Sequence, residues 1–225
     1  MTDYYLKKIK IEGTSHLFVC RGYSQIVDSE QLEKPFLFKR QLYANLYRSD
    51  NLLLKVCYGQ SFPKDVLRKY VLESQAEREF KSADILSKMG ILTPKSYFSA
   101  FSISPFTKGL VESMHEMDFL DGFEGLNKHF IHRHDSLDII RSFARDLAII
   151  TNEMLIPKDL GLGNIMYKTE ETKLAWLDTD LKKISNKKKL THKIITSLNS
   201  RFLKYLNRHQ VGVFWDVFSE RSTIL

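Results

Sequence analysis

The chain has 225 residues, a formal net charge of +7 and 43% hydrophobic residues, values that exclude a disordered protein and allow one domain or two small lobes. Its two cysteines, Cys20 and Cys57, are too few for a disulfide framework, so we interpret them as buried thiols of a reducing compartment. No apolar run approaches the ~18 residues of a membrane span, and the start of the chain lacks the apolar core of a signal peptide. We therefore expect a cytoplasmic protein, either soluble or peripheral to a membrane.

The first part of the chain contains short strand-like stretches. In the last of them, NLLLKVCYG, Lys55 shares one face with Leu53 and Cys57, where a half-buried ammonium needs an anionic partner. The alternative is an edge-strand lysine that faces water. Turn residues at 49–51 predict a hairpin between the last two stretches. The stretches are KIKIEG at 8–13, HLFVCRG at 16–22, FLFKRQLYANLYR at 36–48 and NLLLKVCYG at 51–59.

A helix is predicted from Asp65 to Met89, with Gly90 as its stop signal. On this helix Glu79 lies on the apolar stripe and calls for a buried partner, for which Lys55 is the obvious candidate. Its neighbour Glu77 lies among charged positions and is interpreted as an ordinary surface residue. Two further strands are expected in SYFSAFSIS at 96–104 and KGLVESMHEM at 108–117.

The turn-rich segment DGFEGLN at 121–127 marks a boundary between an N-terminal lobe, residues 1–120, and a C-terminal lobe, residues 121–225. After it we expect a helix capped by Asp135 or Ser136, a loop at 157–164, a hairpin turning at 170–171 and a helix over 187–209. Strands with one long helix followed by a mainly helical part predict an α+β protein with two unequal lobes.

The loop KDLGLGN carries the pattern most closely tied to chemistry. Asp159 and Asn164 are separated by four residues, the spacing of a kinase catalytic loop, and two glycines are expected to let the loop turn tightly. The hairpin that follows would return Asp178 to the side of Asn164, and an amide with a carboxylate can supply oxygen ligands to Mg²⁺. Asp180, two residues on, is either a second metal ligand or a helix cap, and we favour the cap.

Taken in order, these stretches resemble the bacterial lipopolysaccharide kinase family, the Kdo and core heptose kinases of the protein-kinase-like superfamily. The resemblance covers residues 40–185 in patches and rests on LLLKV, AEREFKSADILSKMGILTP, KDLGLGNIMY and LAWLDTDLKKI. It implies a two-lobed fold with a small N-terminal β-sheet lobe. It also implies transfer of the ATP γ-phosphate to a sugar hydroxyl of a lipid-linked saccharide at the cytoplasmic face of the inner membrane.

The resemblance also implies the roles of single residues. Asp159 would be the catalytic base, and Asn164 with Asp178 would bind magnesium. The set that binds ATP would be Lys55, Glu79 and Lys158.

Three departures from the family pattern leave other functions open. No glycine-rich loop precedes Lys55, Pro157-Lys158 replaces His-Arg before Asp159, and Thr179 follows Asp178 where Phe-Gly is usual. The alternatives are a small-molecule or protein kinase of the same fold, or a non-catalytic kinase-like protein that binds a membrane or partner. The basic run from Lys182 to Lys193 suits an anionic membrane surface, or it is a solvated helix start. No nucleic-acid partner is expected, because the motifs of such proteins are missing.

Overall fold

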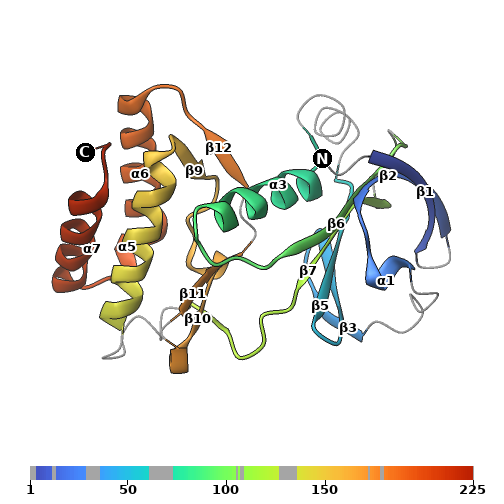
Figure 1. The fold of residues 1–225 in the computed structure, drawn as a ribbon, viewed down its shortest axis with the longest axis horizontal. Helices are drawn as coiled ribbons and strands as arrows, with labels where there is room; N and C mark the ends of the chain where they lie inside the picture. The colour runs from blue at the N-terminus through green and yellow to red at the C-terminus, as the bar shows by residue number, and fades with distance from the viewer. Residues whose placement is uncertain are drawn as a thin grey trace. The chain divides into compact units, whose positions relative to one another are not determined.

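The computed structural model divides the chain into two units (Figure 1). Unit 1 is Met1–Asp84 with Pro94–Asp121, and unit 2 is Ile85–Thr93 with Gly122–Leu225. A division at residue 120 places residues 85–93 in the N-terminal lobe. In the structure they belong to unit 2, because Leu86 and Ile91 are buried in its core. The structure describes residues 4–11, 14–28, 36–60, 73–104, 106, 109–126, 136–171, 173–177 and 180–224.

Unit 1 is built on a seven-stranded antiparallel sheet with the strand order β1-β2-β6-β7-β5-β4-β3. One face of the sheet buries an apolar cluster that includes Phe18, Leu54, Phe98 and Met114. The strands are β1 (Tyr4–Ile11), β2 (Thr14–Gly22), β3 (Phe36–Arg40), β4 (Ala44–Ser49), β5 (Leu52–Tyr58), β6 (Ser96–Ser102) and β7 (Val111–Asp118).

The predicted hairpin between β4 and β5 is confirmed, with Ser49 opposite Leu52 and Asp50 in the left-handed region at φ 49°. The stretch 36–48, in contrast, forms two strands, because the chain turns between Arg40 and Ala44 and pairs β3 with β4. Strand β5 lies between β4 and β7, so the edge-strand interpretation of Lys55 is wrong.

Helix α3 (Gln75–Lys88) is shorter than predicted. Residues 61–72 lie outside the described part of the chain, and the helix cannot extend back through Glu73, whose φ is 70°. The hydroxyl of Ser74 accepts a hydrogen bond from the Glu77 N–H at 3.2 Å and caps the helix. At the other end Gly90, with φ 75°, follows the helix as expected.

The helices of unit 2 within the described part of the chain lie side by side (Figure 1) and enclose an aromatic core. In this core Phe143 stacks on Trp176 at 5.2 Å and contacts Phe202 at 4.2 Å between ring centroids. The helices are α5 (Ser136–Asn152), α6 (Lys187–Arg201) and α7 (Arg208–Arg221). The strands are β8 (Glu124–Gly125), β9 (Leu155–Pro157), β10 (Ile165–Lys168), β11 (Lys173–Trp176) and β12 (Leu181–Lys183), and the 3-10 turns are η1 (Leu162–Asn164), η2 (Thr169–Glu171) and η3 (Leu203–Tyr205).

The prediction of one helix over 187–209 is wrong. Helix α6 ends at Arg201, and Asn207 begins α7 with a capping box in which Asn207 and Gln210 exchange hydrogen bonds of 2.9 Å. The predicted hairpin is confirmed as β10 paired with β11. Ser136 is the first residue of α5, and Asp135 lies outside the described residues.

Antiparallel sheets combined with a group of helices confirm the predicted α+β class. Among the described residues, no helix has both the length and the apolar composition needed to cross a bilayer.

Candidate active site

Lys55 and Glu79 form a buried ion pair in unit 1. The ammonium lies 3.0 Å from Glu79 Oε1, and the two side chains are 5% and 4% exposed. Strand β5 presents Lys55 on the sheet face opposite Leu54 and Val56, and α3 directs Glu79 toward it. The contact expected from the sequence is therefore present, while its role in binding nucleotide stays a prediction.

Besides Lys55, two polar side chains contact the Glu79 carboxylate, and a third contacts one of these two. Gln75 donates to Oε1 at 2.7 Å, His115 Nδ1 lies 3.4 Å from Oε2, and Ser96 Oγ lies 2.8 Å from the other ring nitrogen of His115. Burial alone would raise the pKa of Glu79, but the Lys55 ammonium and the hydrogen bonds outweigh burial, so its pKa lies well below the ordinary value. Glu79 is thus ionised and fixes the Lys55 ammonium.

Glu77 is also buried, so its interpretation as a surface residue is wrong. Arg21 donates to Oε1 at 3.0 Å and Ser99 to Oε2 at 3.0 Å, and the hydroxyl of Tyr4 also donates to Oε1. Burial raises the pKa of Glu77, yet these hydrogen bonds lower it by more, and the net shift is downward. The donors come from β1, β2 and β6, which cover this side of α3.

In unit 2 the loop KDLGLGN leaves β9 and passes through η1 into β10. Pairing of β9 with β12 fixes its start, because the Lys158 N–H donates to the Asp180 carbonyl at 3.0 Å. Asp159 Oδ1 accepts from the Gly161 N–H at 3.0 Å and from the Arg201 guanidinium. No group in the described part of the chain donates to Asp159 Oδ2.

The two glycines of the loop do not have positive φ, and Gly161 has φ −71° and ψ 147°. Gly161 is required for a steric reason, since an added Cβ would lie 3.0 Å from Asp159 Oδ1. A larger residue at this position would displace the carboxylate.

Asn164 is oriented by its amide nitrogen, which donates to the Asp159 carbonyl at 3.3 Å. This leaves Oδ1 of the amide for a cation, and no donor to it lies among the residues that the structure describes. The Asn164 carbonyl accepts from the Leu177 N–H at 2.8 Å, so the hairpin returns residue 177 to Asn164. Asp178 itself lies outside the described residues.

Asp180 and Lys158 form an ion pair of 2.6 Å. Asp180 is not a helix cap, because the chain continues from it into β12 and Asn186 caps α6 by accepting from the Lys189 N–H at 3.0 Å. Lys158, assigned to nucleotide binding, is thus engaged with Asp180 here. The role of Lys158 in binding ATP stays a prediction, and so does that of Asp180 as a second metal ligand.

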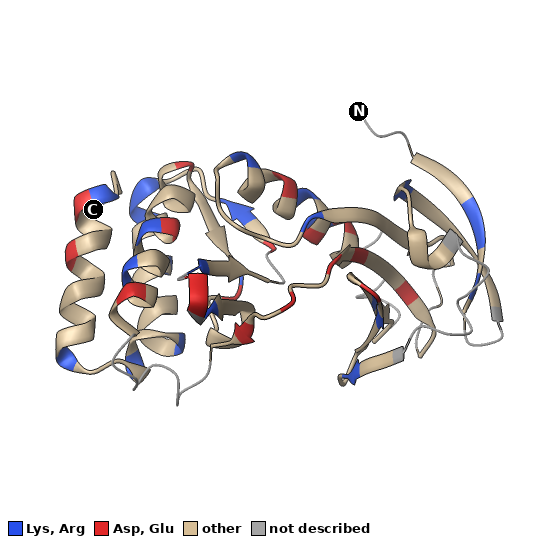
Figure 2. Ribbon diagram, turned by 60° about the horizontal axis from the view of Figure 1, so that its bottom comes forward, with Lys and Arg blue, Asp and Glu red and all other residues tan. Residues whose placement is uncertain are grey.

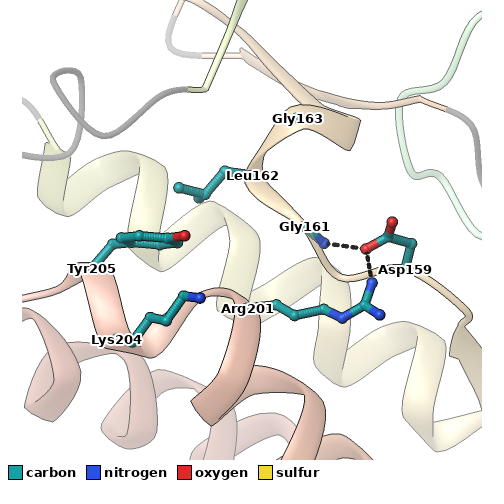
Figure 3. A pocket seen from close by; sticks show the side chains of 7 residues that line it. All are labelled: Asp159, Gly161, Leu162, Gly163, Arg201, Lys204 and Tyr205. Atoms are coloured by element: carbon teal, nitrogen blue, oxygen red, sulfur yellow. Dashed lines mark hydrogen bonds and ion pairs between the residues drawn. The ribbon is translucent and has the colours of Figure 1, made fainter. Parts of the chain in front are cut away.

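A pocket of about 440 Å³ opens beside Asp159 (Figure 3). The Arg201 and Lys204 side chains extend toward the loop that carries Asp159, and Leu162 and Tyr205 form an apolar side of the pocket. The remaining lining residues are Gly161 and Gly163.

Sequence reasoning missed His115 and the cations Arg201 and Lys204. His115 lies opposite Lys55 in the β5–β7 register, a pairing that the sequence does not contain. Arg201 is 42 residues from Asp159 and reaches it only because α6 ends beside the loop. The one local signal for the end of α6 was the Asn-x-x-Gln spacing at Asn207 and Gln210, which marks the start of a new helix.

The donor set fits a magnesium nucleotide in part. A buried, carboxylate-anchored lysine suits phosphate oxygens, and an oriented asparagine amide suits Mg²⁺. Among the described residues no group of three His, Cys, Asp or Glu side chains could hold a metal ion, so a site here would need Asn164 and a carboxylate outside them.

No protein-family model and no curated protein matches the chain in sequence. In structure it resembles WbdD in complex with the kinase inhibitor LY294002, with a TM-score of 0.58 and 14% identity over 98% of this chain and 53% of that chain. It also resembles a choline/ethanolamine kinase family protein from Mesorhizobium loti, with a TM-score of 0.51 and 10% identity over 89% of this chain and 74% of that one. The chain thus spans about half of the WbdD chain. At these identities the likeness establishes the fold, which is protein-kinase-like.

Proposed function

We propose that the protein is an ATP- and magnesium-dependent kinase that phosphorylates a sugar hydroxyl of a lipopolysaccharide core or a related glycolipid. The observation that carries the proposal is the loop of unit 2, in which Asp159 and Asn164 are oriented within a kinase-like fold. The buried Lys55–Glu79 pair of unit 1 supports it independently. Phosphoryl transfer needs little more than such positioned charges.

Asp159 is the base in this proposal. Gly161 and Arg201 engage Oδ1, which leaves Oδ2 to accept the proton of the acceptor hydroxyl. The acceptor oxygen forms a bond to the γ-phosphorus of ATP, the bond from this phosphorus to the β,γ-bridging oxygen breaks, and ADP leaves with that electron pair. Lys55 holds phosphate oxygens, and Asn164 with Asp178 would hold magnesium, which neutralises phosphate charge when bound.

The glycolipid acceptor is supported by the resemblance of the motifs between residues 40 and 185 to lipopolysaccharide kinases, and by the basic run. Lys182, Lys183 and the three lysines at 187–189 are exposed. The last three occupy the first turn of α6, where positive charge opposes the helix dipole at a cost of roughly 0.3–1 kcal/mol each. A placement that costs stability favours a role in binding an anionic membrane surface over a merely solvated face.

A second candidate is a non-catalytic kinase-like protein that binds a membrane or partner. The turn between β3 and β4, in the region before Lys55, has no glycine, and its Leu42 is 84% exposed. A loop of this kind does not offer the backbone approach to phosphates that a glycine-rich loop gives.

Nucleotide binding and transfer are tested separately. Mg–AMP-PNP should raise the melting temperature of the full chain, and labelled ATP should transfer phosphate to an inner-core glycolipid. Asp159→Asn should lower transfer by at least about 100-fold and keep the nucleotide-induced shift, because this carboxylate acts on the acceptor. Transfer at the unmutated rate would remove Asp159 from the mechanism, and a missing nucleotide shift would favour the non-catalytic candidate.

A further inference from the structure

The pocket beside Asp159 contains more positive than negative charge. Its lining includes two cations, Arg201 and Lys204, and one carboxylate, Asp159. The loop itself supplies no cation, because DLGLGN has none and the adjacent Lys158 is paired with Asp180. The end of α6 and the turn η3 therefore bring positive charge to the loop from a distant part of the sequence.

Both cations have donors left for a ligand. Arg201 is shown in contact with Asp159 through Nη1, and a guanidinium has five N–H donors in all. The Lys204 ammonium lies 4.9 Å from the centroid of the Tyr205 ring and forms no ion pair with an acidic residue in the described part of the chain. Arginine binds phosphate and carboxylate with paired hydrogen bonds, and a lysine adds a point charge.

The rest of the pocket suits an uncharged ring. Tyr205 and Leu162 offer apolar surface, and the glycines Gly161 and Gly163 leave their backbone accessible. A volume of about 440 Å³ lies in the range of small-molecule sites.

The acceptor explains this pocket better than the nucleotide does. Neither Asn164, the predicted magnesium ligand, nor Lys55, the predicted phosphate ligand, lines it. The Arg201–Asp159 pair is also exposed, at 47% and 53%, and exposed pairs are weak, so an anion can share the guanidinium.

We propose that Arg201 and Lys204 bind an anionic group of the acceptor, so that the acceptor is a hydroxyl compound which already carries a phosphate or a carboxylate. That the bound compound is the acceptor of phosphoryl transfer rests on the proposed function. That the pocket binds an anion rests on the pocket alone. Binding there places the acceptor's hydroxyl beside Asp159 and selects against neutral sugars.

The test is a titration of the full chain with inorganic phosphate at constant ionic strength, followed by the amide NMR signals of Gly161 and Gly163. Saturable shifts are expected with phosphate and none with glucose. Arg201→Gln and Lys204→Gln should each weaken phosphate binding at least about tenfold, since each removes a charged donor. Arg208→Gln is the matched control, because it removes one exposed positive charge of unit 2 outside the pocket and should leave binding unchanged.

A second arm separates the two sources of phosphate. With saturating Mg–AMP-PNP the phosphate shifts should persist, as expected for an acceptor subsite. Displacement of phosphate by the nucleotide would assign the cations to ATP and overturn the proposal, as would absent shifts or an equal loss in the Arg208→Gln control. Failure of AMP-PNP to bind at all would instead count against the proposed function, with the phosphate titration still deciding whether the subsite exists.

Discussion

At the scale of single residues, the most consequential feature is a charged pair that has little access to water. Lys55 and Glu79 lie 3.0 Å apart and are almost fully buried. A buried pair adds little net stability compared with apolar residues, but removal of one partner leaves an uncompensated buried charge. The main effect of the pair is therefore to hold the Lys55 ammonium in one position, which agrees with the proposal that Lys55 binds phosphate oxygens of ATP.

Lys55→Met should lower the free energy of unfolding by about 3–5 kcal/mol at pH 7.5, because Glu79 stays buried and ionised without its cation. The pKa of Glu79 lies below its ordinary value in the native protein, so the pair stabilises the fold above the unfolded-state pKa and this contribution is lost as the pH falls. In the variant Glu79 can take up a proton, so the deficit should shrink toward pH 5. Urea unfolding at both pH values measures this.

Lys173→Met is the control, because Lys173 pairs with Glu171 at an exposed site and should change stability by less than about 1 kcal/mol. The double variant Lys55→Met/Glu79→Leu should recover part of the loss while still lacking a nucleotide-induced shift. A loss as small as that of Lys173→Met would mean that water reaches Glu79.

The same residues explain what sequence reasoning could and could not find. Lys55 and Glu79 were identified because the periods of strands and helices place each on a defined face. Glu77 was misjudged because the donors that bury it, Tyr4, Arg21 and Ser99, come from three strands whose arrangement over α3 is not a local property. Arg201 was missed for the same reason.

At the scale of elements, α5 and β11 are joined by a partly buried polar contact. Trp176 Nε1–H donates to Asp146 Oδ2 at 2.8 Å. Burial raises the pKa of Asp146 from 3.8 to about 6, although the hydrogen bond from Trp176 and the charge of Arg145 oppose the shift. Between these pH values the native protein holds a proton that the unfolded chain has released.

Because the unfolded chain then binds fewer protons, the free energy of unfolding should fall as the pH rises from about 4 to about 6, by roughly 2–3 kcal/mol. Asp146→Asn stays neutral and keeps an acceptor for Trp176, so it should be more stable than the unmutated protein at pH 7.5 and equally stable at pH 4. Thermal unfolding at the two pH values measures the difference. Asp138→Asn on the same helix, at an exposed site, should show no such gain; an equal gain there would contradict the assignment.

Element boundaries were predicted well where a local signal exists and poorly where two signals compete. Gly90 follows the end of α3, and Asp50 turns the chain between β4 and β5, because both residues adopt left-handed backbone. The apolar stripe over 187–209 suggested one helix, whereas Asn207 and Gln210 form a capping box that starts another. The spacing Asn-x-x-Gln is present in the sequence, but it follows a stripe of apolar positions that continues at helical spacing to Leu206.

At the scale of the whole molecule, the α+β class followed from the order of strands and helices, whereas the seven-stranded sheet did not. Its order pairs β2 with β6 and β5 with β7, strands that lie far apart in sequence and that local pattern cannot assign to one another. The net charge is likewise a property of the whole molecule. The net charge is +7, and basic residues occur in both units (Figure 2), so attraction to an anionic surface is expected in general.

The question is whether the lysines at 187–189 bind such a surface in particular. Near an anionic membrane each basic residue contributes about 1 kcal/mol, so replacing all three with glutamine should lower partition onto vesicles containing phosphatidylglycerol by roughly 100-fold. The matched control replaces Lys8, Lys10 and Lys39, three exposed lysines of unit 1, and leaves the same net charge. If the patch binds, cosedimentation falls with the first variant and hardly with the second, and both effects vanish at high salt. Equal losses would mean that only net charge matters, and the lysines of α6 would then be a solvated helix start.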